Sequence, residues 1–454
     1  MKNLALSLTW LLCVSASAQV VTTVYSFSAG TDGSQPNAVV EGRDGSLYGT
    51  TFYGGSNGLG TIFRVSTSGS ESILYSFLTS GGQWPQSGLT LATNGKFYGV
   101  TKISGGDTFG VVFDISANGV FNDAYSFLGG SDGGDPYWPP VEASDGNLYG
   151  TTFGHDGGAI VHPSTVYKLD RSGTFTTIYT FAKTQYLLGL VEGDDGNLYG
   201  TDDVTAQGDG CGEIFKMTTS GTLLFTHAFT MYNQGPCLPD SGLIQASDGN
   251  FYGTTIYGGV YNGGTIYKLT QDGHVTVLHS FGSSIPDLPP FGLVQGTDGN
   301  FYAAGGGGTN GTGRLLQITL SGTVAELYDF PANTRYGGGP TSPLIQHTNG
   351  KFYGTADLPT TTESGEVYSL DMSLGPFIGF VRPTGKVGQT AQILGQGLTG
   401  TTSVTFNGVP AASFSVVSDT YMTAVVPSGA TTGPMVVTTP TAKLTSNVNF
   451  RISN

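Results

Sequence analysis

The sequence predicts an all-β protein in which a seven-bladed β-propeller is followed by a small immunoglobulin-like β-sandwich. Three observations lead to this prediction. An aromatic residue before glycine, or once before alanine, recurs seven times at a period near 50 residues. Each repeat holds four short strand candidates, and one strand of the repeat stands alone at the start of the chain. Four-stranded units of this period are typical of propeller blades.

The repeat is anchored by a tyrosine that follows a tight turn. Successive anchors are 50, 51, 50, 53, 50 and 51 residues apart, and they are Tyr48, Tyr98, Tyr149, Tyr199, Tyr252, Tyr302 and Tyr353. An Asp-Gly or Asn-Gly dipeptide precedes each of them, as at Asp44-Gly45. These dipeptides suit the positive-φ positions of a two-residue hairpin. We therefore expect the first two strands of every blade to form a tight hairpin.

The lone strand at Val24–Phe27 matches the outer strand of the other repeats. The seventh repeat ends with its third strand, Val367–Leu370, and no outer strand follows it. The chain thus starts with the outer strand of its own last blade, which predicts a closed ring. The long, variable loops then emerge on one face and the tight turns on the other. Because binding residues tend to lie on loops of a rigid scaffold, this loop face is the candidate functional face.

The N-terminus predicts export. Residues 1–18 have a basic start, a short apolar core and a small-residue end, as in a secretory signal peptide. Residues 19–374 form the propeller and residues 376–454 the sandwich in this interpretation. The formal charge of −15 argues against nucleic acid, and no segment after the signal is long and apolar enough to span a membrane. We expect a monomer, secreted or associated with the cell surface.

Two cysteines remain after the signal peptide, Cys211 and Cys237. Both fall on the loop face beside the fourth blade. In an exported chain such a pair predicts a disulfide, and two free thiols are the alternative.

The repeat resembles the GloVer tandem-repeat family of exported bacterial proteins. The pattern DGNFYGTT, GG, GTIYKLT and LHSF over 248–281 carries the resemblance, which covers residues 21 to about 372. The sixth repeat departs from it at Tyr302-Ala303. The resemblance implies export and surface association, and no activity.

The C-terminal segment is similar to the IPT/TIG immunoglobulin-like family. The matching residues are Pro383, Gly388, Gly395-Gln396-Gly397, Val404 to Gly408, Val426-Pro427, Gly433 and Val436-Val437. Relatives that bind DNA do so with basic loops, and only Arg382, Lys386, Lys443 and Arg451 are basic here. The resemblance implies a spacer or adhesion module.

A ring of polar residues is predicted near the propeller axis. Three positions before the hairpin turn, the innermost strands carry Glu41, Leu91, Glu142, Glu192, Gln245, Gln295 and Gln346. Carboxylates and amides around an axis can hold a structural cation or a sugar. They can equally bond to the backbone of neighbouring blades, as buried polar groups must. Both interpretations stay open at this point.

Aromatic residues gather on the predicted loop face. They are Tyr53, Trp84, Tyr137, Trp138, Tyr232, Tyr257 and Tyr261. Exposed rings beside Asn and Asp suit stacking on sugars. The alternative is that the rings cap the ends of the blades.

No motif for catalysis, phosphate binding or a metal centre is found. His155 and His162 share one loop with Asp156, but no third ligand is apparent. Asp202, Asp203 and Asp209 are unique to the fourth repeat and leave acid–base chemistry open. His227 and His279 replace a tyrosine of the outer strand and are expected at the edge of the core. We predict no cofactor and no metal.

Two functions follow from these observations. The first is a non-catalytic binding, adhesion or scaffold protein whose loop face takes a glycan or an extracellular protein, with the sandwich as spacer. The alternative is a propeller enzyme, similar to a polysaccharide lyase or a lactonase, centred on the axial Glu/Gln ring.

Overall fold

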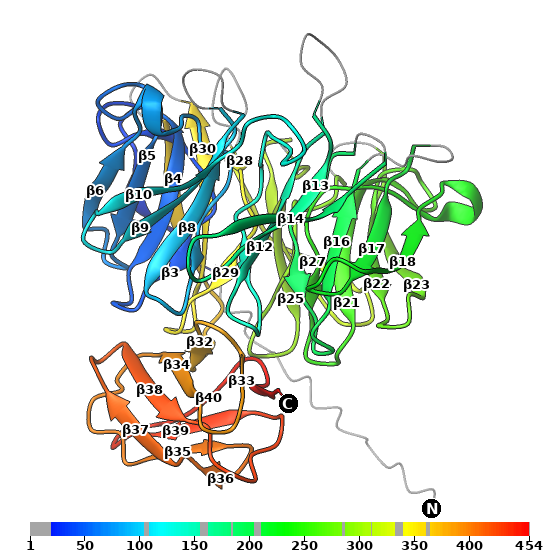
Figure 1. Ribbon diagram of the computed structural model, residues 1–454. Helices are drawn as coiled ribbons and strands as arrows, with labels where there is room; N and C mark the ends of the chain where they lie inside the picture. The colour runs from blue at the N-terminus through cyan, green and yellow to red at the C-terminus, as the bar shows by residue number, and fades with distance from the viewer. Residues whose placement is uncertain are drawn as a thin grey trace, which may run out of the picture.

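The fold is all-β, with seven antiparallel sheets in the repeat region and a separate C-terminal domain (Figure 1). The computed structural model describes residues 20–103, 109–154, 162–182, 185–203, 210–283, 287–309, 311–331, 339–359 and 364–453. The predicted signal peptide, His155, Asp156 and Asp209 lie outside these residues. No helix in the described ranges is long and apolar enough to cross a bilayer.

The first four sheets follow one another along the chain, and each is named here by its number in that order. Sheet 1 contains β2 (Ser34–Pro36), β3 (Val40–Glu41), β4 (Leu47–Tyr53), β5 (Thr61–Val65) and β6 (Glu71–Ser76). Sheet 2 contains β7 (Thr90–Leu91), β8 (Lys96–Thr101), β9 (Val111–Ser116) and β10 (Phe121–Ser126), after the short helix η1 (Thr79–Gly81). Sheet 3 contains β11 (Val141–Glu142), β12 (Leu148–Thr152), β13 (Thr165–Leu169) and β14 (Phe175–Thr180). Sheet 4 contains β15 (Val191–Glu192), β16 (Leu198–Asp202), β17 (Glu213–Met217) and β18 (Leu223–Ala228).

The last three sheets repeat the same order, after a second short helix, η2 (Tyr232–Gln234). Sheet 5 contains β19 (Pro236–Pro239), β20 (Ile244–Gln245), β21 (Phe251–Gly258), β22 (Thr265–Leu269) and β23 (Val275–Ser280). Sheet 6 contains β24 (Val294–Gln295), β25 (Phe301–Gly305), β26 (Arg314–Ile318) and β27 (Val324–Asp329). Sheet 7 contains β28 (Gly339–Pro340), β29 (Ile345–Gln346), β30 (Phe352–Pro359), β31 (Ser364–Asp371) and β1 (Val20–Ser26).

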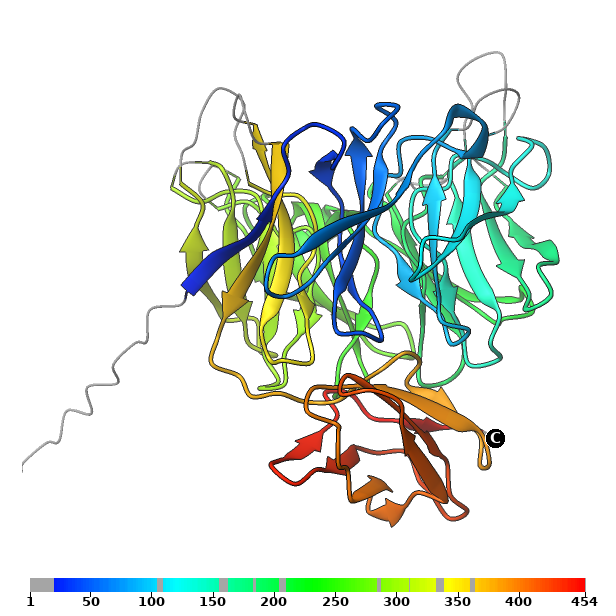
Figure 2. The same cartoon turned by 90° about the vertical axis from the view of Figure 1, so that its left-hand side faces the viewer.

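The N-terminal strand pairs with the last strand of the repeat region, as the lone strand predicts. β1 runs antiparallel to β31 with Val21 opposite Leu370 and Tyr25 opposite Val367, and the two lie side by side in Figure 2. β1 begins earlier than the expected Val24. Phe27, directly after β1, is fully buried. The two ends of the repeat region therefore share one sheet.

The repeated residues serve packing and turn geometry. The anchor tyrosines are buried, and their hydroxyl groups bond to the turn residue four positions earlier. Tyr199 donates to Asp195 over 2.8 Å, and its ring stacks on Phe251 of the next sheet at 4.0 Å. Each anchor thus fixes its own turn and also joins two sheets, which explains why it recurs in every repeat.

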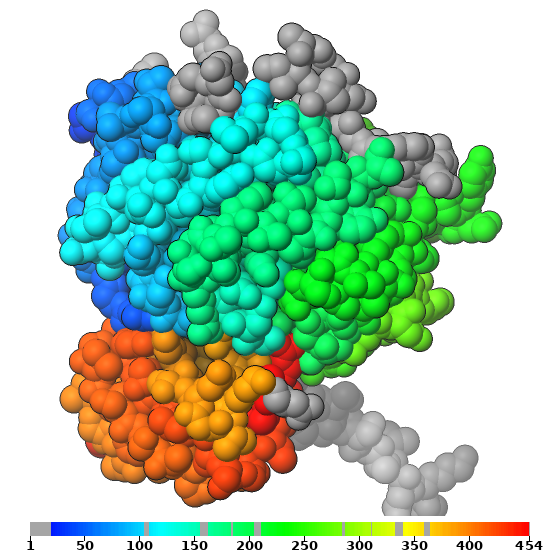
Figure 3. Space-filling model, in the orientation of Figure 1, coloured from blue at the N-terminus to red at the C-terminus, as the bar shows by residue number. Residues whose placement is uncertain are grey.

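The C-terminal domain consists of two four-stranded sheets and one two-stranded pair around a hydrophobic core. The strands are β32 (Gly379–Phe380), β33 (Thr384–Gly385), β34 (Thr390–Leu394), β35 (Ser403–Phe406), β36 (Val409–Pro410), β37 (Ser413–Val416), β38 (Tyr421–Val425), β39 (Met435–Thr438), β40 (Lys443–Thr445) and β41 (Arg451–Ile452). Buried Ile393, Phe406 and Met435 belong to its core. The domain packs directly against the repeat region (Figure 3).

Candidate functional site

The predicted axial residues bond to the neighbouring sheet. In each case the side-chain oxygen accepts a hydrogen bond from the backbone N–H just before the turn of the preceding sheet. The pairs are Glu41 with Thr348 (2.8 Å), Glu142 with Thr93 (2.6 Å), Glu192 with Ser144 (3.0 Å), Gln245 with Asp194 (2.9 Å), Gln295 with Ser247 (2.8 Å) and Gln346 with Thr297 (3.0 Å). The first pair joins sheet 1 to sheet 7. The structure therefore gives these groups the backbone partners of the second interpretation.

Leu91 holds the seventh position and cannot accept such a bond. At this junction the Arg43 guanidinium donates to the carbonyl oxygen of Thr93 over 2.8 Å. The same guanidinium donates to Gln392 of the C-terminal domain over 2.6 Å and lies over the ring of Tyr421 at 4.7 Å. Arg43 thus supplies a hydrogen bond at the junction where Leu91 can supply none, and it also binds the C-terminal domain.

Two arginines of the C-terminal domain reach the axial carboxylates. The Arg451 guanidinium lies 2.7 Å from Glu192, and both side chains are about nine-tenths buried, at 11% and 8% exposed. Arg382 lies 3.5 Å from Glu142 and donates to the carbonyl oxygen of Ala143 over 3.3 Å. Both contacts lie at the tight-turn end of the sheets. The C-terminal domain therefore contacts the innermost strands at that end of the sheets.

The remaining axial carboxylate, Glu41, is paired within the repeat region. Nε2 of His347 lies 3.4 Å from a carboxylate oxygen of Glu41. Burial raises the pKa of the Glu41 carboxyl, and the nearby His347 and the Thr348 hydrogen bonds oppose that rise. Within the described residues, no group of three or more His, Cys, Asp or Glu side chains has the arrangement of a metal site.

The aromatic residues expected on the loop face divide into two groups. Trp84, Tyr137 and Trp138 are only partly exposed. Trp84 stacks on Phe52 at 6.5 Å and Tyr137 on Phe153 at 5.3 Å, so these rings cap strand ends. In contrast, Tyr53, Tyr232, Tyr257 and Tyr261 are 44%, 77%, 48% and 63% exposed. Tyr53 ends β4 of sheet 1, Tyr232 lies in η2 between sheets 4 and 5, and Tyr257 and Tyr261 lie in and after β21 of sheet 5.

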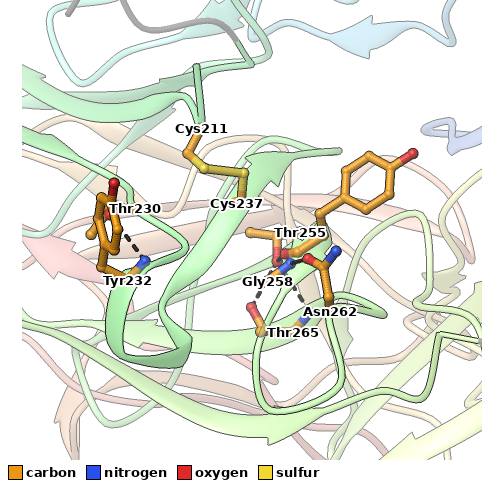
Figure 4. Close-up of a disulfide and its surroundings, with 9 residues drawn as sticks. Cys211, Thr230, Tyr232, Cys237, Thr255, Gly258, Asn262 and Thr265 are labelled. Carbon is orange, nitrogen blue, oxygen red and sulfur yellow. Dashed lines mark hydrogen bonds between the residues drawn. A yellow bond between two sulfur atoms is a disulfide. The ribbon is translucent and has the colours of Figure 1, made fainter. Parts of the chain in front are cut away.

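The predicted disulfide between Cys211 and Cys237 is present (Figure 4). Both cysteines are buried, and they join the start of β17 to β19. Leu238 donates its backbone N–H to the carbonyl oxygen of Cys211 over 2.7 Å, which strengthens the same junction. The bond therefore fixes the segment that carries Tyr232.

The strand that carries His227 borders a cavity. A cavity of about 610 Å³ lies between β18 and β23, and Tyr232, His227, His274 and His279 are among its lining residues. Burial lowers the pKa of His227, with a smaller effect from His274, and burial also lowers the pKa of His279. His227 and His279 are both partly exposed, as expected for the edge of the core.

Sheet 4 carries two acidic side chains where sheets 1, 3 and 5 carry two threonines. Asp202 and Glu213 face each other in β16 and β17, whereas the matching positions of sheet 1 are Thr51 and Thr61, whose hydroxyl oxygens lie 2.8 Å apart. Buried Gln185 donates to Glu213 over 3.2 Å. Comparison of the repeats finds Asp202 from the sequence, and the same comparison would have found Glu213.

A second pair of carboxyl groups lies at the loop-side end of sheets 4 and 5. Burial raises the pKa of Asp203 to about 6, and burial together with the charge of Asp203 raises the pKa of Asp240 to about 7. Burial is also the main cause of the raised pKa of nearby Tyr137, and Asp240 adds to it. Asp240 was missed in the sequence because its loop is not aligned between repeats.

His162 is buried beside Asp135, with Nε2 3.6 Å from the carboxylate. His155 and Asp156 lie outside the described residues, so the loop that they share with His162 is described only in part.

The comparison with protein families matches most of the chain. The model of the Gloeobacter/Verrucomicrobia repeat matches residues 12–203 and 186–413. The chain belongs to this repeat family. A comparison with curated proteins found no match to this chain.

Solved structures with a similar fold are enzymes of low sequence identity. A streptogramin B lyase shares 16% identity over 78% of this chain and 97% of that chain, with a TM-score of 0.55. A virginiamycin B lyase from Staphylococcus aureus shares 15% over 78% and 99%, with a TM-score of 0.56. A puromycin hydrolase shares 16% over 76% of this chain and 53% of that chain, with a TM-score of 0.51. At these identities the likeness concerns the fold alone.

Proposed function

We propose that this member of the repeat family is an exported, non-catalytic binding protein that takes a neutral glycan at its loop face. In this proposal the seven sheets are the blades of a closed propeller. The C-terminal domain is an immunoglobulin-like domain of the IPT/TIG type that caps the tight-turn face. The protein is secreted or held at the cell surface by non-covalent contacts.

The observation that carries the proposal is the contrast between the two faces. Arg451 and Arg382 of the C-terminal domain bind Glu192 and Glu142 at the tight-turn end. The axial groups there already have protein partners, so an axial active site has little support. The opposite end presents exposed Tyr232, Tyr257 and Tyr261. Exposed rings with polar neighbours favour sugar binding.

Ring closure is supported by contacts that recur between consecutive sheets. The side chain that binds the preceding sheet does so from sheet 1 to sheet 7 as it does elsewhere, through Glu41 and Thr348. The Thr341 hydroxyl donates to the carbonyl oxygen of Pro36 over 3.1 Å across the same junction. A gap at this junction would leave these groups without these partners.

The test is direct binding of glycans to the purified chain that starts at residue 19. A neutral-glycan array is followed by titration calorimetry with the best ligand, and product formation is monitored by mass spectrometry. The proposal expects saturable binding with the glycan recovered intact. Absence of binding at millimolar glycan, or cleavage of the glycan, contradicts it.

One observation favours a second candidate, an enzyme that uses acid–base chemistry. Asp203 and Asp240 have pKa values of about 6 and about 7, which suits proton transfer near neutral pH. This centre lies at the loop-side end, away from the axial ring. Glycan cleavage by the wild type that is lost in Asp203→Asn and Asp240→Asn favours this candidate over the first.

A further inference from the structure

The cavity between β18 and β23 lies where two other junctions carry a stacked pair of aromatic residues. At two other junctions the outer-strand tyrosine stacks on an aromatic residue of the next sheet. Tyr75 stacks on Phe121 at 4.0 Å, and Tyr125 stacks on Phe175 at 3.7 Å. At the junction of sheets 4 and 5 the corresponding residues are His227 and Val275. Both are smaller than the stacked aromatic residues, and both line the cavity. The junction of sheets 5 and 6 carries the same pair of residue types, His279 and Val324, so the η2 segment that forms the other wall distinguishes this junction.

One wall of this groove is held in a fixed and unusual backbone conformation. Asn233 and Gln234 of η2 have φ angles of +56° and +63°, which residues other than glycine seldom adopt. Tyr232 donates its backbone N–H to the Thr230 hydroxyl over 3.1 Å (Figure 4). The disulfide at Cys237 secures the end of the same segment. Strained backbone in a fixed segment is a frequent feature of binding sites.

The chemistry of the groove is neutral and polar with one exposed ring. Its lining contains no Asp, Glu, Lys or Arg, although the whole chain has a formal charge of −15. Tyr232 at the rim is 77% exposed, and the amides of Asn233 and Gln234 stand next to it. Burial lowers the pKa of His227 and of His279, which favours their neutral imidazoles. Such a lining has no carboxylate, ammonium or guanidinium group to bind an ionic ligand, and it offers hydrogen bonds to hydroxyl groups.

We infer that the groove formed by His227, Tyr232, Asn233, Gln234, His274 and Val275 is the binding site for a neutral oligosaccharide. A sugar ring stacks on Tyr232, and the amide and imidazole groups bond to its hydroxyls. This inference rests on the proposed glycan-binding function. It places the ligand in a groove that starts at Tyr232 on the loop face and continues between the outer strands β18 and β23.

The experiment fills the groove and compares two matched variants. His227→Tyr with Val275→Phe introduces the stacked Tyr–Phe pair that two other junctions carry. Tyr232→Ala removes the exposed ring. Leu223→Phe, which adds an aromatic residue between sheets 3 and 4, is the control for filling. Phe414→Ala, at an exposed aromatic residue of β37 in the C-terminal domain, is the control for ring removal. Each protein is titrated with cellohexaose, xylohexaose, laminarihexaose and chitohexaose, and folding is checked by thermal unfolding.

We expect binding of one or more hexasaccharides by the wild type and by both controls. Tyr232→Ala should weaken it about tenfold or more, and the filled groove should abolish it while keeping the fold. If the wild type binds and both groove variants bind equally well, the groove inference is wrong while the proposed function stands. If the wild type binds none of the four sugars, the groove assignment is overturned. The array in the preceding section then decides the general proposal separately. If the filled variant does not fold, Tyr232→Ala alone decides.

Discussion

The two arginines of the C-terminal domain show how single residues join distant parts of this chain. Arg451 and Glu192 are 259 positions apart, and the pair is largely removed from solvent. Ser144 of the preceding sheet also donates its N–H to Glu192 over 3.0 Å. The carboxylate thus connects two sheets and the C-terminal domain. A buried charge with partners of this kind becomes costly when one partner is removed.

Replacement of Arg451 by alanine should therefore lower the free energy of unfolding. We expect a loss of about 3–5 kcal/mol, because Glu192 is left buried without its counter-charge. Urea unfolding followed by tryptophan fluorescence measures the change. Lys443→Ala, at an exposed position of β40, should change stability by less than about 0.5 kcal/mol. Equal effects of the two substitutions would mean that the ion pair contributes nothing.

Asp240 should make stability depend on pH. Its pKa is about 7 in the folded chain, against an ordinary value of 3.8, so the folded state binds more protons between these values. Stability should accordingly fall as the pH rises from about 4 to about 7. Asp240→Asn removes this loss. The variant should match the wild type near pH 4 and exceed it by about 1–3 kcal/mol at pH 8. A difference of the same size at both pH values, measured by urea midpoints, would contradict this explanation.

Among the elements, β1 has the largest consequence for the repeat region. It supplies the outer strand of sheet 7 although it comes first in the sequence. Gly365 shows how close the junction is, because a β-carbon there would lie 2.3 Å from Cδ of Pro36. β1, Gly365 and Pro36 thus all lie where sheet 7 meets sheet 1.

Deletion of β1, residues 20–26, should destabilise the protein and promote association. We expect a loss of about 3–6 kcal/mol, since seven residues lose their ladder hydrogen bonds and neighbouring contacts. The exposed edge of β31 then offers a template for another chain. Unfolding curves and light scattering after size exclusion measure the two effects, with the chain starting at Val20 as control. A monomer of unchanged stability would remove the support for a closed ring.

At the scale of the whole molecule, the C-terminal domain is integrated with the repeat region. It contacts residues in the turns of several sheets. Gln392 donates to the Thr93 carbonyl over 2.7 Å, and Gln396 donates to the Thr348 hydroxyl over 3.0 Å. The sequence resemblance implied a spacer or adhesion module and did not predict these contacts. They fit a cap, as in the proposed function.

This integration predicts a single unfolding transition for the complete chain. Differential scanning calorimetry should show one peak, because the buried ion pairs couple the two parts. In Arg382→Ala with Arg451→Ala the coupling is weakened, and two peaks should separate. Two peaks already present in the wild type would show that the two parts are independent.

Much of the fold could be predicted because the same pattern of turns and strands occurs seven times in the sequence. The turn dipeptides, the anchor tyrosines and the lone strand each follow local rules of turn geometry or strand pairing. The disulfide was predicted from two cysteines and an expected signal peptide, and the structure decided it against two free thiols. The sequence did not decide what Glu142 and Glu192 do. A ligand site and hydrogen bonds to the neighbouring sheets require the same residue types.

The sequence by itself determined the sheets, their repeat and the return of the first strand to the last sheet, since these depend on short-range patterns. The tertiary structure alone decided that Arg382 and Arg451 bind Glu142 and Glu192 at the tight-turn end of the sheets and that a groove lies between β18 and β23. The physical reason is that both features depend on what lies opposite a side chain. Neighbours of that kind come from residues up to 259 positions away in the chain.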